Sequence, residues 1–123
     1  MPINWAINLN SYSDHIQFLY LTTTGWKTRK EHQIEIWFIE YEGKYYLISE
    51  RREQAHWVQN IIHDPKVSFT VGEKKMNGKG RIVNKDKERK LAAEVSKLID
   101  EKYKWGRGMI AQLTAINPAN WVL

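Results

Sequence analysis

Hydrophobic and polar positions alternate along the first half of the chain, which is the pattern of half-buried β-strands. Ile34, Ile36 and Phe38 fall on one face of such a strand, and Glu42-Gly43 is typical of a tight hairpin turn. Many of these positions carry β-branched or aromatic side chains, which favour strands. The pattern predicts three consecutive antiparallel strands, over residues 16–24, 31–41 and 44–49.

The hydrophobic period then changes to three and four residues, which is the period of an amphipathic helix. The first such helix is predicted over residues 53–63, and Asp64-Pro65 ends it. Its apolar face comprises Ala55, Val58, Ile61 and Ile62. The second helix is predicted to extend to about residue 104, with Asn84 as its cap. Its apolar face comprises Leu91, Val95, Leu98 and Ile99.

Short apolar runs predict three further strands, over residues 67–71, in a basic stretch through 82–83, and over 109–116. The hairpin between the first two has two candidate turns, Gly72-Glu73 and Asn77-Gly78, of which Asn-Gly is the stronger local signal. A short helix is predicted within residues 1–15. The resulting order is β-β-β-α-β-β-α-β. Six short antiparallel strands that must protect one another's edges indicate an α+β fold built on a small barrel.

Length and composition restrict the kind of protein. The 123 residues, 42% of them hydrophobic, suffice for one domain over residues 1–123. The absence of cysteine excludes disulfides, thiolate metal sites and cysteine nucleophiles. There is no apolar run long enough to cross a membrane and no secretory leader, so we expect a soluble, cytoplasmic protein. Redox chemistry in such a chain would need a bound organic cofactor.

Charge and aromatic content point towards ligands. The net charge of +5 is concentrated in residues 74–123, which carry +7, whereas residues 1–73 carry −2. A basic face of this kind attracts phosphates, acidic metabolites, nucleic acid or an anionic membrane surface, and peripheral membrane contact stays open. Six Trp and six Tyr exceed the needs of a small core. Large flat side chains are favoured at interfaces and in pockets for flat ligands, which indicates a homodimer.

Metal binding and serine hydrolysis are not supported. The histidines are His15, His32, His56 and His63, and no carboxylate stands at ligand spacing from them. No nucleophile-elbow motif surrounds Ser49. We predict no metal site.

The loop over residues 22–30 is the strongest local feature of the sequence. It combines threonine hydroxyls, a glycine and three cations between two predicted strands, and such groups suit a phosphate. A basic hairpin with no ligand is the alternative from composition alone. Because the strand over 33–38 and the helix that carries Trp57 would flank this loop, a planar ring attached to the phosphate could lie along that strand.

Residues 21–83 resemble the split β-barrel flavin-binding superfamily, which is pyridoxamine phosphate oxidase-like, and in particular its deazaflavin-dependent nitroreductase and quinone reductase branch. The resemblance rests on four segments in matching order and spacing. They are Thr23-Thr24-Gly25-Trp26-Lys27-Thr28, Trp37-Phe38, Trp57-Val58-Gln59-Asn60 and Asp64-Pro65-Lys66-Val67. The resemblance implies a six-stranded split barrel, and it places the hairpin turn at Gly72-Glu73.

The resemblance also implies a cofactor site at a subunit interface. The implied phosphate ligands are Thr24, Gly25, Lys27, Thr28, Arg29 and Lys30. The strand implied to line the ring comprises Ile34, Glu35, Ile36 and Trp37. Arg51 and Arg52 would reach an acidic tail or the ring's negative edge, and Trp57 would stack on the ring or wall the site. Core or dimer packing is the alternative role for the two tryptophans, and solvent exposure is the alternative for the two arginines.

This chain departs from the pattern of that branch at four positions. Trp26 stands where the branch has Arg, Arg29 where it has Gly, His32 where it has Arg, and Glu35 where it has Pro. The resemblance implies the 8-hydroxy-5-deazaflavin coenzyme as cofactor, and these departures leave flavin mononucleotide (FMN) as the alternative. Five cations near one pocket favour the longer, more acidic deazaflavin coenzyme.

The function predicted from the sequence is hydride transfer from a flavin-type cofactor to a small electron-poor acceptor, a quinone or a nitro compound. A nucleic-acid-binding small barrel is one alternative, but its aromatic residues would lie in the acidic half of the chain, away from the lysines. We therefore predict no nucleic-acid partner. A cofactor-binding protein without turnover of its own is the other alternative, because hydride transfer requires no particular acid or base.

Overall fold

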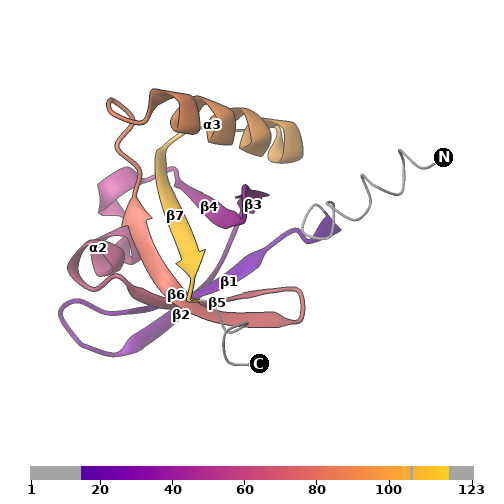
Figure 1. The fold of residues 1–123 in the computed structure, drawn as a ribbon. Helices are drawn as coiled ribbons and strands as arrows, with labels where there is room; N and C mark the ends of the chain where they lie inside the picture. The colour runs from indigo at the N-terminus through magenta and orange to yellow at the C-terminus, as the bar shows by residue number, and fades with distance from the viewer. Residues whose placement is uncertain (1–14, 106, 117–123) are drawn as a thin grey trace.

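The computed structural model describes residues 15–105 and 107–116, which form one seven-stranded sheet and its helices (Figure 1). The predicted helix over residues 1–15 lies outside the described residues except for residue 15. The strands are β1 Leu19–Thr24, β2 Glu31–Ile36, β3 Phe38–Tyr41, β4 Lys44–Ser49, β5 Lys66–Val71, β6 Lys74–Ile82 and β7 Met109–Ala115. The helices are the 3₁₀ turn η2 Arg52–Gln54, α2 His56–His63 and α3 Arg89–Tyr103.

The strands are hydrogen-bonded in the order β2-β1-β5-β6-β7-β4-β3, and every pair is antiparallel. The two strands at the ends of this order, β2 and β3, follow one another in the chain with only Trp37 between them. The sheet must therefore curl until its two edges meet at one point of the chain. This is a barrel that is split between β2 and β3, and it confirms the predicted α+β split-barrel class.

The prediction of six strands was wrong, because the single strand expected over residues 31–41 is broken at Trp37. The backbone N–H of Phe38 donates a hydrogen bond to the Tyr103 hydroxyl (3.1 Å). The Trp37 ring stacks on the Tyr103 ring, with centroids 4.5 Å apart and planes 8° apart. A residue of α3, distant in sequence, thus occupies the place of a strand partner and divides the strand in two.

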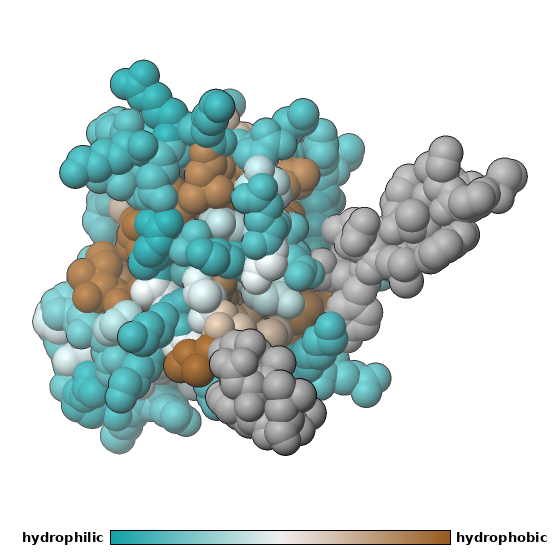
Figure 2. All heavy atoms as spheres, in the orientation of Figure 1, coloured by the Kyte–Doolittle hydropathy of each residue, from teal (hydrophilic) through white to brown (hydrophobic). Residues whose placement is uncertain are grey.

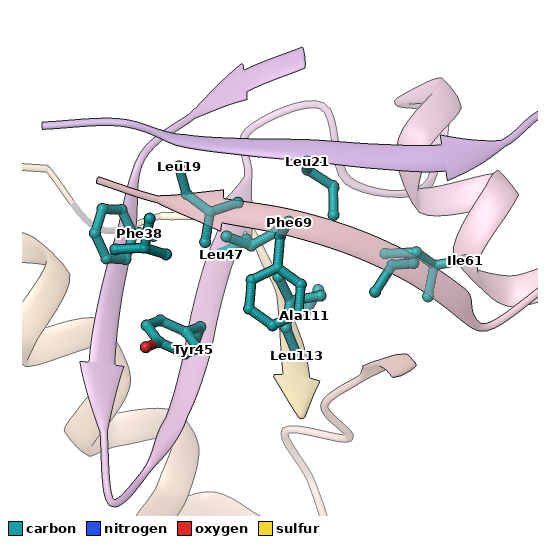
Figure 3. Packing of buried hydrophobic residues seen from close by; sticks show 11 residues of the cluster. Leu19, Leu21, Phe38, Tyr45, Leu47, Ile61, Phe69, Ala111 and Leu113 are labelled. Carbon is teal, nitrogen blue, oxygen red and sulfur yellow. The ribbon is translucent and has the colours of Figure 1, made fainter. Parts of the chain in front are cut away.

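The interior of the barrel is packed with large apolar side chains from facing strands (Figure 3). Leu19 and Leu21 of β1 point into it, and Phe69 of β5 packs edge-on against Tyr45 of β4 with ring centroids 5.4 Å apart. Phe38 is buried in this core, and Ile34 and Ile36 are partly buried and pack against it, on the face that the alternation predicted.

A second core lies between α3 and the outer face of the sheet, where α3 crosses above β7 and β4 (Figure 1). Tyr46 and Ile48 of β4 and Ile39 of β3 are buried there against Val95 and Ile99. Both faces of β4 are therefore covered, which explains why five of its six residues are buried. The rest of the surface in this view is mostly hydrophilic, with hydrophobic side chains visible in places between polar ones (Figure 2).

Both helices differ in detail from the prediction. The α-helix α2 begins at His56 and not at residue 53, because η2 precedes it, and Ile62 is 52% exposed although its spacing places it beside the apolar face. Asn84 does not cap α3. Its Oδ1 accepts hydrogen bonds from the backbone N–H groups of Asp86 and Lys87, so it caps the turn that precedes the helix.

The β5–β6 hairpin turns at Gly72-Glu73, since Val71 pairs with Lys74. Gly78 lies within β6, opposite Ala115. A Cβ atom at Gly78 would lie 2.2 Å from the carbonyl oxygen of Thr114, so the neighbouring strand requires glycine here. Close approach of backbones, and not a turn, explains the Asn77-Gly78 pair. Among the described helices none has the length and apolar character needed to span a membrane.

Candidate functional site

A cleft of about 790 Å³ opens between the β1–β2 loop, β2 and α2, and we call it the first cleft. Its lining comprises Thr23, Gly25, Trp26, Lys27, Thr28, Glu31, His32, Gln33, Ile34, His56, Trp57, Gln59 and Asn60. The volume lies within the range of small-molecule and cofactor sites, which is roughly 300 to 1,000 Å³. The loop predicted to bind a phosphate therefore forms one wall of the first cleft.

The loop over residues 25–30 is closed by its own backbone. The N–H of Gly25 donates to the carbonyl of Lys30 (2.7 Å), and the N–H of Arg29 donates to the carbonyl of Gly25 (2.8 Å). Arg29 adopts a positive φ of 62° at the tip of this turn. The Thr28 Oγ1 accepts a hydrogen bond from the Lys30 N–H (3.2 Å). Its hydroxyl proton has no acceptor among the described residues, so it could be donated to a ligand in the cleft.

The side chains of Thr28 and His32 pack closely against the backbone of Gly25. A Cβ atom there would lie 2.6 Å from Thr28 Oγ1 and 2.9 Å from His32 Nε2. A hydroxyl and an imidazole thus converge beside a bare backbone, with the Lys27 side chain on the same cleft wall. Hydroxyl, imidazole and ammonium groups around a glycine are a donor set that suits a phosphate.

The side chain of Asn60, on α2, holds the start of the loop by two hydrogen bonds. Its Nδ2 donates to Thr23 Oγ1 (2.9 Å), and its Oδ1 accepts from the backbone N–H of Trp26 (3.1 Å). Asn60 and Thr23 are only 4% and 2% exposed, so these bonds satisfy polar groups that water does not reach. These two hydrogen bonds tie the start of the loop to α2.

Two further contacts join the loop to the end of α2. The Trp26 ring stacks on the His63 ring, with centroids 4.1 Å apart and planes 15° apart. Arg29 forms an ion pair with Asp64, with Nη2 and Oδ2 3.1 Å apart. The backbone N–H of Lys66 and then Arg29 lower the pKa of Asp64, so its carboxylate remains charged. Trp26 and Arg29, which depart from the pattern of the resembled branch, therefore hold the loop against the helix.

A second cleft, of about 370 Å³, lies at the end of β2. Its lining comprises Phe18, Glu35, Ile36, Trp37, Ile48, Glu50 and Trp105. Tyr20 donates a hydrogen bond to Glu35 Oε2 (2.9 Å), and this bond is the main reason that the pKa of Tyr20 is raised. We call this the second cleft.

The structure divides the predicted site residues into three groups. The first cleft is lined by Gly25, Lys27, Thr28, Ile34 and Trp57. The second cleft is lined by Glu35, Ile36 and Trp37. Neither lining includes Thr24, Arg29, Lys30, Arg51 or Arg52. Of the five cations expected near one pocket, only Lys27 lines the first cleft, because Arg29 turns towards Asp64 and the two arginines lie at η2.

Sequence reasoning missed several residues of the first cleft. They are Thr23, Trp26, Glu31, His32, Gln33, His56, Gln59 and Asn60. The signal for Asn60 was present, since a polar residue falls on the buried face of an amphipathic helix together with Val58 and Ile61. In the part of the chain that the structure describes, no three histidines or carboxylates lie close enough together to hold a metal ion.

The fold and this site define a class: a split β-barrel whose first hairpin loop forms one wall of a cleft large enough for a cofactor. The family model of the F420H(2)-dependent quinone reductases matches residues 8–108, and the chain belongs to that family. This confirms the resemblance stated from the sequence. No curated protein matches the sequence.

Solved structures agree on the fold. A putative pyridoxamine 5′-phosphate oxidase from Listeria innocua is 11% identical, covers 92% of this chain and 94% of its own, and gives a TM-score of 0.68. An F420-H2-dependent reductase is 24% identical, with coverage of 78% and 92% and a TM-score of 0.55. A haem storage protein from Vibrio cholerae is 15% identical, with coverage of 90% and 89% and a TM-score of 0.67. The barrel is thus shared by proteins with different ligands.

Proposed function

We propose that this protein is an oxidoreductase that binds the 8-hydroxy-5-deazaflavin coenzyme in the first cleft. Its family match supports this choice of coenzyme, and the donor set around Gly25 fits a phosphate. When bound and reduced, the coenzyme supplies a hydride. The acceptor in this proposal is a small electron-poor molecule, a quinone or a nitro compound.

Different residues would bind different parts of the coenzyme. Lys27 and the Thr28 hydroxyl would hold the phosphate, since a charge-assisted hydrogen bond is about twice as strong as a neutral one. Ile34 and Trp57 would give the coenzyme ring an apolar wall that excludes water. Arg51 and Arg52, exposed beside α2, would meet the acidic tail.

The observation that carries the proposal is the loop over residues 25–30, which presents a cation and a free hydroxyl proton at the mouth of a cleft with apolar walls. A fluorescence titration with the deazaflavin coenzyme and with FMN tests it. We expect tighter binding of the deazaflavin coenzyme, and a steeper loss of its affinity with added salt, because exposed charge pairs are screened over about 8 to 10 Å at physiological ionic strength.

Turnover is measured separately, as oxidation of the reduced coenzyme on addition of quinones or nitro compounds. Tighter binding of FMN at every salt concentration would contradict the choice of coenzyme. Coenzyme binding without oxidation by any acceptor would indicate a cofactor-binding protein with no turnover of its own.

We also propose that the protein is a homodimer. Large hydrophobic side chains that stay exposed support this, among them Phe18, Tyr20, Trp26 and Ile62. Light scattering at micromolar concentration should give twice the 14.6 kDa chain mass. A monomeric mass with the coenzyme bound would contradict the dimer and any site shared between subunits.

A further inference from the structure

The outer face of β1, β2, β5 and β6, which we call the open face, is covered by neither described α-helix. The α3 helix packs on β3, β4 and β7, and α2 packs on the interior core through Ile61 (Figure 1). Every second residue of the four strands points outward, because the residues between are core residues such as Leu21 and Phe69. The open face is thus a sheet face without a helix partner in the described part of the chain.

The strand register arranges the outward residues of the open face in rows across the sheet. Tyr20 pairs with both Glu35 and Thr70, and Thr70 pairs with Lys75, so Glu35 and Lys75 end the same row. The β2 ends of three successive rows are Glu35, Gln33 and Glu31, and their β6 ends are Lys75, Asn77 and Lys79. The open face therefore carries carboxylates along its β2 edge and lysines along its β6 edge.

These edge charges find no opposite charge within one chain. Among the described residues, none of Glu31, Glu35, Lys75 and Lys79 forms an ion pair. Glu35 accepts a hydrogen bond from the neutral Tyr20 hydroxyl. The two edges are three strand spacings apart, which is about 14 Å, so the carboxylates and lysines of one copy do not meet across the face.

A two-fold axis that runs parallel to the strands, between β1 and β5, would bring the opposite charges together. Rotation about this axis exchanges the β2 and β6 edges of the open face and keeps the rows in register. Glu35 would then face the partner's Lys75, and Glu31 would face the partner's Lys79. A surface that is complementary to itself under a two-fold rotation is what an isologous dimer interface requires.

The sizes of the outward side chains suit the same arrangement. The outer face of a barrel is convex, so two copies approach most closely along the axis and diverge towards the edges. Thr22, Ser68 and Thr70, in the two strands beside the axis, are short, whereas the glutamate and lysine side chains at the edges are long. Tyr20 is the large residue beside the axis, and it would lie against the partner's Thr70.

We propose that a second copy of this chain docks on the open face about this axis and brings its β6 lysines to the rims of both clefts. Glu31 lines the first cleft and Glu35 lines the second, so the partner's Lys79 and the partner's Lys75 would lie beside them. Lys27 is the only lysine or arginine among the described lining residues of the first cleft. The partner would therefore supply further positive charge for an acidic coenzyme. This inference rests on the proposed homodimer and locates its interface.

Reversal of one charge tests the interface. We expect Glu35→Lys and Lys75→Glu each to weaken self-association about tenfold or more, because each substitution places like charges opposite one another twice in the dimer. The variant with both substitutions restores opposite charges in each pair and should associate within about threefold of the wild type. Sedimentation equilibrium measures the dissociation constants, and circular dichroism verifies that each variant is folded.

Two control variants separate charge at this interface from other effects. Asn77→Leu changes the β6 edge without changing its charge, and Lys90→Glu reverses a charge on the exposed face of α3. Both should leave the dissociation constant within about threefold of the wild type. A wild-type dimer that is unaffected by Glu35→Lys, or a double variant that associates no better than the single variants, would overturn this interface and leave the dimer standing. A monomeric wild type would overturn both, whereas the coenzyme titration tests the oxidoreductase proposal independently.

Discussion

Asn60→Leu is expected to lower the free energy of unfolding by about 2 to 4 kcal/mol and to weaken coenzyme binding about tenfold or more. The substitution removes both hydrogen bonds of the amide and leaves Thr23 Oγ1 and the Trp26 N–H without these partners. A buried donor or acceptor left unsatisfied costs about 1 to 3 kcal/mol. The loop loses its anchor, so the loss should extend to the ligand. Urea unfolding and fluorescence titration measure the two effects.

Asn77→Leu is the matched control. Asn77 lies on β6, its side chain is exposed, and the same change of residue there removes no buried hydrogen bond. We expect a change in stability within about 0.5 kcal/mol and unaltered coenzyme affinity. If Asn60→Leu matched this control in coenzyme affinity, the loop would not depend on Asn60 for its position.

Lys27→Ala is expected to weaken binding of the deazaflavin coenzyme about tenfold or more, with little change in stability. Lys27 is exposed at the first cleft, with Nζ 4.9 Å from the centre of the Trp26 ring. A hydrogen bond from a charged group to phosphate contributes about 1.5 to 3 kcal/mol, which corresponds to roughly 10-fold to 100-fold in affinity. Fluorescence titration at low and high salt measures the loss and its screening.

Two comparisons isolate the role of Lys27. Lys90→Ala, on the exposed face of α3, removes the same charge away from the cleft and should leave the affinity unaltered. Arg29→Ala should weaken binding less than Lys27→Ala, because Arg29 is already paired with Asp64. Equal affinities of the wild type and Lys27→Ala would remove the loop from the proposed coenzyme site.

The kinds of element and their approximate positions could be predicted from the sequence. Strand alternation and helical spacing are local properties, and they located the strand over residues 44–49 and the apolar faces of both helices. The loop over residues 22–30 was also identified locally, because its hydroxyls, glycine and cations are adjacent in sequence. Ile62 and Asn84 show the limit of such patterns. Sequence spacing predicts which face of a helix is apolar and which residue could cap it. The burial of a side chain and the first residue of the helix depend on the residues that pack around them.

What the sequence determined by itself was the periodicity of each segment and the chemistry of one loop. The tertiary structure alone decided where the long strand breaks, since Tyr103 reaches Phe38 from 65 residues away. It likewise decided that Asn60 holds the loop and that Asp64 forms an ion pair with Arg29. It also placed Glu35 and Trp37 in a second cleft. These are contacts between residues remote in the chain, and local periodicity carries no information about which remote groups will meet when the sheet curls into a barrel.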